Sequence, residues 1–142
     1  MATLARLVLS LTAALALVGH PATRIPAGVR TIAVHSSRGV SRRVTDPQKV
    51  AKIVRWFDAL PKAPRGVVYA CPLMRYERPT TFDFRGAGGA SLTRARTPGA
   101  AACGLSIDFT VRGHARRPVL VGRFLGRVGR LLGMRLVPVP RS

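Results

Sequence analysis

The stretch TDPQKVAKIVRWFDALP, residues 45–61, decides the fold because it carries a complete helix signal. Thr45 or Asp46 is suited to cap a helix, and proline, present at position 47, is favoured in a first turn. The apolar residues that follow recur at helical spacing: Val50, Ile53, Val54, Phe57 and Leu60. They share one face, so the spacing predicts an amphipathic helix over about residues 46–60, ended by Pro61.

Alternating or β-branched runs flank this helix on both sides. They cover residues 29–35, 40–44, 66–71, 81–85, 90–96 and 104–112. Each run is typical of a strand. A second helix is predicted over 119–133, and a tail or short edge strand over 134–142. The pattern favours a single α+β domain, in which two helices pack on an antiparallel sheet of four to six strands.

The amino-terminal segment has the features of a secretory signal. Arg6 precedes a 12-residue apolar run, residues 7–18. Twelve helical residues span about 18 Å, less than the roughly 30 Å of a bilayer core. We therefore predict a signal peptide over 1–27, with cleavage near Ala22 or Ala27, and a domain over 28–142. The alternative is a buried helix. No cysteine lies near residue 20, so a secreted protein without a lipid anchor is expected.

Secretion makes the two cysteines interpretable. Cys71 and Cys103 are the only cysteines, and in an oxidising compartment such a pair is expected to form a disulfide. A Cys-x-x-Cys redox motif is absent, so the bond is interpreted as structural. Closing a loop of about 33 residues stabilises a fold by roughly 3–4 kcal/mol in the chain-entropy model.

The chain is strongly basic, with 24 Lys+Arg against 5 Asp+Glu and a net charge of +19. A GC-rich coding sequence explains arginine in place of lysine, but it does not explain the scarcity of acids. We predict a surface that binds an anionic polymer, a membrane surface or an acidic protein. Specific nucleic-acid readout is not expected, because most of the few aromatic residues lie in core patterns. The candidate residues are Arg94, Arg96, Arg112, Arg116, Arg117, Arg123, Arg127, Arg130 and Arg135.

The second predicted helix separates three kinds of residue. Its apolar residues fall on one face, the glycines at 122, 126, 129 and 133 on a second, and the arginines at 123, 127 and 130 on a third. One interpretation is a groove in which a partner approaches bare backbone beside an arginine row. The other, which we favour, is a solvated basic face whose glycines reflect coding bias.

Catalytic signals are weak. His35 and His114 are far apart in the sequence, and common hydrolase, metalloprotease and phosphate-loop motifs are absent. Asp83 and Asp108 alternate with apolar residues, so both should point away from the core. They could be neighbours across strands and act as an acid–base pair, but pairing with arginines is favoured. We expect no enzyme activity, no cofactor and no metal.

Two resemblances are present. The succession of Asp46 to Pro61, Cys71-Pro72, Phe82 to Phe84, Cys103-Gly104 and a closing helix resembles small secreted proteins of unknown function from high-GC actinobacteria. That resemblance spans most of the chain after the signal and implies no activity.

The second resemblance is local. CPLMRYERP, residues 71–79, closed by Cys103, is similar to the reactive loop of subtilisin-inhibitor-like proteins. It implies a protease inhibitor whose scissile bond lies at Leu73–Met74, with Met74–Arg75 or Arg75–Tyr76 as shifted registers. The sequence departs from that family by lacking its other disulfide, by one extra residue before Tyr76 and by its final helix.

Overall fold

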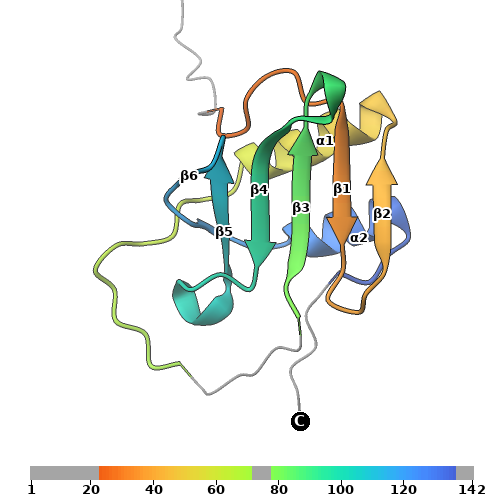
Figure 1. Ribbon diagram of the computed structural model, residues 1–142. Helices are drawn as coiled ribbons and strands as arrows, with labels where there is room; N and C mark the ends of the chain where they lie inside the picture. Colours follow the sequence, from red (N-terminus) through yellow and green to blue (C-terminus); the bar gives the residue numbers. More distant parts are fainter. Residues whose placement is uncertain (1–22, 72–77, 137–142) are drawn as a thin grey trace, which may run out of the picture.

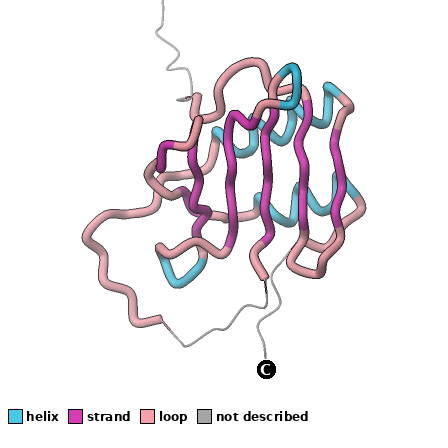
Figure 2. Tube along the Cα trace, in the orientation of Figure 1, coloured by secondary structure: helices cyan, strands magenta, loops and turns pink. Residues whose placement is uncertain are grey.

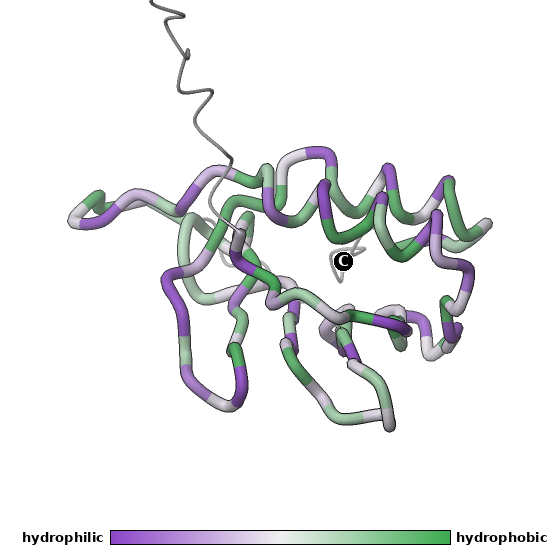
Figure 3. The backbone as a smooth tube through the Cα atoms, turned by 90° about the horizontal axis from the view of Figure 1, so that it is seen from above, coloured by the Kyte–Doolittle hydropathy of each residue, from purple (hydrophilic) through white to green (hydrophobic). Residues whose placement is uncertain are grey.

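The computed structural model describes residues 23–71 and 78–136. Among them, two helices lie on the same face of an antiparallel sheet (Figures 1 and 3). The predicted α+β class, antiparallel sheet, pair of helices and disulfide are confirmed. The strands are β1 (Thr31–His35), β2 (Ser41–Val44), β3 (Thr80–Arg85), β4 (Ser91–Thr97), β5 (Ser106–Val111), β6 (His114–Ala115) and β7 (Val119–Leu120).

The sheet order is β2-β1-β3-β4-β5-β6, and β7 pairs with β5 off this path. Two short 3-10 turns, η1 (Ala87–Gly89) and η2 (Ala102–Gly104), stand before β4 and β5 (Figure 2). The strand pattern places alternate side chains on opposite faces. Phe82 and Phe84 on β3, for example, are buried against the helices, whereas Asp83 between them faces the other way.

The first helix, α1 (Pro47–Asp58), forms as its local sequence predicts. Asp46 is the N-cap, and its Oδ1 accepts from the backbone N–H of Gln48 at 2.9 Å. This bond satisfies one of the four amide groups that a helix start leaves without a partner. The face predicted from spacing supplies the buried residues Val50, Ile53 and Phe57.

Phe57 joins the layers of the core. Its ring centroid lies 5.6 Å from that of Phe84, 5.3 Å from that of Phe109 and 5.6 Å from that of Phe124. All three contacts are edge-to-face, the arrangement that aromatic quadrupoles favour. One side chain of α1 therefore packs against β3, β5 and the second helix.

The second helix, α2 (Phe124–Leu132), starts later than the predicted residue 119. Val119 and Leu120 instead form β7, opposite Ile107 and Ser106 of β5. The Leu120 N–H donates to the carbonyl of Pro61 at 2.8 Å, so both sides of β7 have backbone partners. Gly122 has φ +45°, a left-handed conformation suited to glycine, and this turns the chain from strand to helix.

The predicted strand over 66–71 is wrong, because these residues form no strand. Their chain leaves the sheet after a bridge between Lys62 and Val119 and projects as a long loop (Figure 1). Without a neighbouring strand the β-branched residues have no ladder to join. Val68 is 96% exposed as a result.

The described chain begins with a segment anchored in the core. Ile25 is 1% exposed. The backbone N–H groups of Arg24 and Ile25 donate to Asp58 Oδ1 at 2.9 and 3.0 Å, and the Arg24 guanidinium donates to the Asp58 carbonyl at 2.7 Å. Residues 24–25, which fall within the predicted signal segment 1–27, therefore pack against the end of α1. No helix within residues 23–71 and 78–136 has the length and apolarity needed to cross a bilayer.

Candidate functional site

Each of the four carboxylates in the described ranges accepts a hydrogen bond from a nearby group, although Asp108 Oδ1 is buried without a partner. Asp46 caps α1, and Asp58 accepts from the N–H groups of Arg24 and Ile25. Asp83 accepts from Arg85 Nε at 2.7 Å and from Ser91 Oγ at 2.5 Å, and Asp108 Oδ2 accepts from the N–H of Ala100 at 3.0 Å. Little negative charge is left to neutralise the cations.

Ion pairing is correspondingly sparse. Within the parts of the chain that the structure describes, the only ion pairs closer than 4.0 Å join Asp83 to Arg85, at 2.7 Å, and to Arg94, at 3.9 Å. The expected pairing with arginine is thus observed for Asp83, whereas Asp108 has no ion pair closer than 4.0 Å within the described residues. The remaining described cations are exposed or contact neutral groups. Two sets of them lie on opposite layers of the fold.

The first surface is the exposed side of the two helices. Arg127 places its guanidinium carbon 5.8 Å from the centroid of the half-buried Trp56 ring, a cation–π contact that joins α2 to α1. The exposed basic residues of this helix layer are Lys49, Lys52, Arg55, Arg123, Arg127 and Arg130.

The glycines of α2 do not line an open groove beside these arginines. A Cβ on Gly129 would lie 2.6 Å from the carbonyl oxygen of Met134, so the chain's own following segment occupies that space. Gly122 and Gly133 have positive φ and form the turns at the two ends of the helix. Of the two glycines inside α2, only Gly126 is open, with Arg130 Nη1 as its nearest neighbour at 3.6 Å.

The second surface lies on the sheet face that the helices leave uncovered (Figure 1). A hollow of about 790 Å³ crosses this face from β1 to β6. We call it the sheet trough. Its polar lining includes His35, Thr81, Arg94, Arg96, Thr110 and Arg116.

Strand pairing sets the order of charges in the trough. Arg94 on β4 lies between Asp83 on β3 and Thr110 on β5, and Arg96 lies between Thr81 and Asp108 in the same way. Asp83 and Asp108 do point away from the main core, but β4 separates them. The carboxylates therefore do not form a close pair for acid–base chemistry, and arginines stand between them.

The structure thus divides the predicted anion-binding residues. Arg94, Arg96 and Arg116 come together in the sheet trough, whereas Arg123, Arg127 and Arg130 lie on the helix layer. The others are placed elsewhere. Arg112 is in the β5–β6 turn, and Arg135 is exposed beyond α2. Arg117 donates to the Ala63 carbonyl from Nη2 at 2.8 Å, which fixes the 61–63 loop.

Sequence reasoning did not anticipate the trough or the place of His35 in it. The Nδ1 of His35 is 2.6 Å from Ser41 Oγ, at the end of the β1–β2 hairpin. Alternation in 81–85 and 90–96 indicated which face each side chain would take. It could not indicate that β4 stands between β3 and β5 with its arginines central.

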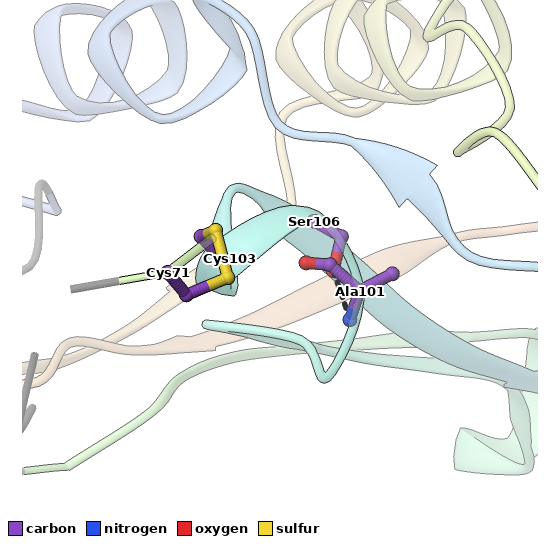
Figure 4. Close-up of a disulfide and its surroundings, with 4 residues drawn as sticks. All are labelled: Cys71, Ala101, Cys103 and Ser106. Atoms are coloured by element: carbon purple, nitrogen blue, oxygen red, sulfur yellow. Dashed lines mark hydrogen bonds between the residues drawn. A yellow bond between two sulfur atoms is a disulfide. The ribbon is translucent and has the colours of Figure 1, made fainter. Parts of the chain in front are cut away.

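The disulfide joins the projecting loop to the turn before β5. Cys71 and Cys103 are bonded, with 5.2 Å between their Cα atoms (Figure 4). The same turn is held by Ser106, whose Oγ accepts from the N–H of Ala101 at 3.1 Å and donates to its carbonyl at 2.8 Å. The predicted inhibitor residues Leu73, Met74 and Arg75 lie outside the described residues.

Metal-binding geometry is not found in the described chain, where no group of three or more histidine, cysteine or acidic side chains could hold an ion. Comparison of the chain with protein-family models, curated proteins and solved structures finds no match.

Proposed function

We propose that this chain is a secreted, non-catalytic domain that binds anionic polymers of the cell envelope or extracellular space. One observation carries the proposal. The described carboxylates are engaged in local contacts, so almost all the cations of a +19 chain are left for external anions.

Secretion is supported by two independent features. The amino-terminal apolar run has signal-peptide length, and the disulfide is of a kind that persists in oxidising compartments. The segment from Arg24 onward belongs to the folded domain, which is consistent with removal of the residues before it.

The excess of arginine also determines what type of binding to expect. Arginine presents a planar fork of donors that matches phosphate and carboxylate oxygens, and each contact releases counterions from a polyanion. Such binding weakens steeply with salt. Binding of a hydrophobic or neutral ligand would not weaken with salt in this way.

The test is retention of the purified protein on an anionic polymer matrix over about 50 to 500 mM salt. We expect strong retention at the low end and loss of retention well before the high end. Retention that is unchanged across this range, or absent at low salt, would contradict the proposal. An uncharged matrix of the same polymer backbone is the control.

A further inference from the structure

We propose that the sheet trough is the specific binding site, and that its ligand is a linear polyol phosphate, a polymer whose phosphodiesters are separated by short hydroxyl-bearing carbon chains. The inference rests on the proposed function and assigns it to one of the two cationic surfaces.

The shape of the trough suits an extended chain. It crosses the sheet from His35 on β1 to Ala115 and Arg116 at β6. Four strand spacings of about 4.8 Å give a length of about 19 Å. Its volume of about 790 Å³ lies in the range of ligand sites. The trough is thus long enough for several repeats of a thin polymer.

The charges in the trough are spaced rather than continuous. Arg94 and Arg96 lie on the same face of β4, about 6.6 Å apart along the strand, and Arg116 stands at one end. Asp83, 14% exposed, lies beside Arg94, and Asp108 is opposite Arg96. A densely charged polyphosphate would meet these carboxylates. A polymer with neutral hydroxyl-bearing spacers can place phosphates at the arginines and uncharged segments beside the acids.

The hydroxyl groups of the trough complete this match. Thr81 and Thr110 lie on either side of β4, opposite Arg96 and Arg94 respectively. Guanidinium groups bind phosphate through two parallel bonds, and threonine hydroxyls both donate and accept. Because these side chains rise from paired strands, little ordering of the protein is needed on binding.

The lining argues against nucleic acid, which shares the phosphodiester chemistry. Single-stranded nucleic acid is bound where bases stack on exposed aromatic rings. The aromatic residues of the trough lining, Phe82 and Phe109, are buried on the helix side of the sheet. Phosphodiesters without bases therefore fit this lining better.

The experiment compares two double variants with the same loss of charge. Arg96→Gln/Arg116→Gln removes cations from the trough, and Arg123→Gln/Arg130→Gln removes them from the helix layer. All four side chains are exposed, and none takes part in an ion pair within the described residues. The probe is fluorescently labelled poly(glycerol phosphate), titrated into each purified protein by fluorescence polarisation at several salt concentrations.

We expect the trough variant to bind the probe at least about tenfold more weakly and its salt slope to fall by about 2, one for each phosphate contact. The helix-layer variant should bind the probe less than about threefold more weakly and keep the salt slope of the native protein. Thermal unfolding verifies that both remain folded. Should the trough double variant fail to fold, the single variant Arg96→Gln is compared with Arg123→Gln in the same way.

The outcomes separate this inference from the proposed function. If the two variants lose affinity for the probe equally, the trough is not the specific site, although polyanion binding still stands. Equal affinity of the native protein for oligothymidylate overturns the polyol phosphate as the ligand. Failure to bind poly(glycerol phosphate) while an anionic matrix still retains the protein overturns the ligand class alone, and failure to bind either overturns the proposed function too.

Discussion

Two glycines in α2 should respond in opposite directions to the same substitution. Gly126 and Gly129 both have helical neighbours on either side and differ in what a methyl group would meet. Alanine is favoured over glycine in a helix interior by about 0.8–1.0 kcal/mol, because glycine loses more backbone freedom on folding. The local surroundings decide whether that gain is realised.

At Gly126 the new Cβ would lie 3.6 Å from Arg130 Nη1, an ordinary contact with the far end of a flexible side chain. Gly126→Ala should therefore stabilise the fold, by about 0.5–1 kcal/mol because the position is in the first turn. For a domain of this size the midpoint of thermal unfolding should rise by roughly 2–6 °C.

At Gly129 the new Cβ would lie 2.6 Å from the Met134 carbonyl oxygen and 3.8 Å from Leu136 Cγ. The first contact is with backbone, and the Met134 N–H also donates to the Gly129 carbonyl at 2.9 Å, so the segment cannot move without losing that bond. Overpacking of this kind costs about 1–3 kcal/mol. After the helix gain is subtracted, Gly129→Ala should destabilise the protein by up to about 2 kcal/mol.

The assay is urea unfolding of the two variants followed by far-UV circular dichroism, with equal slopes required for comparison. Opposite signs are expected. Stabilisation by Gly129→Ala would refute the close packing of residues 134–136 on α2, and destabilisation by Gly126→Ala would refute the open surface at that position.

Three further predictions concern the ends and the cross-link of the domain. Because Arg24 and Ile25 are bound to Asp58 and the core, amino-terminal sequencing of the secreted protein should start at Thr23; a start at Gly28 would contradict this. Truncating Ile25 to alanine should cost about 2–4 kcal/mol in urea unfolding, and a loss below about 0.5 kcal/mol would show that residue 25 is dispensable. Replacing Cys71 and Cys103 together by serine should cost about 3–4 kcal/mol. The native protein should lose the same amount in reductant, whereas the double variant should be insensitive to it.

The parts of the fold predicted from sequence are those whose signals are local. The cap at Asp46 and the apolar spacing through Phe57 lie within one helix, so α1 forms as predicted to within two residues at its end. The disulfide was equally predictable from the sequence, since Cys71 and Cys103 have no alternative partners.

The start of the second helix was predicted wrongly because the same residues fit both the helical spacing and the alternation of a strand. Leu120 and Val121 lie on the apolar face of a helical projection, whereas Val119 and Val121 alternate as in a strand. The choice is made by partners distant in sequence, namely the Pro61 carbonyl and Ile107 of β5. The 66–71 run shows the converse, because its strand-like residues have no partner strand in the structure.

The candidate site was predicted in part for the same reason. Arginines 94 and 96 could be placed on one face from alternation alone. Their separation from the arginines of α2 could not, because it depends on which face of the sheet the helices cover. Strand order, rather than residue type, brings Arg116 into the same hollow.

The two layers present their cations in different ways, and this difference decides where recognition can occur. On α2 the space beside Gly129 is filled by the chain's own segment at Met134, so the arginines there do not share a groove lined by the glycines, and they attract anions without a fixed geometry. In the sheet trough, Arg94 and Arg96 rise from a paired strand beside hydroxyl groups and a hollow. A polymer attracted by charge alone should respond equally to substitutions in either layer, and a polymer that is recognised should respond mainly to those in the trough. The contrast between the two matched double variants therefore measures how much of the +19 charge serves recognition and how much serves general attraction.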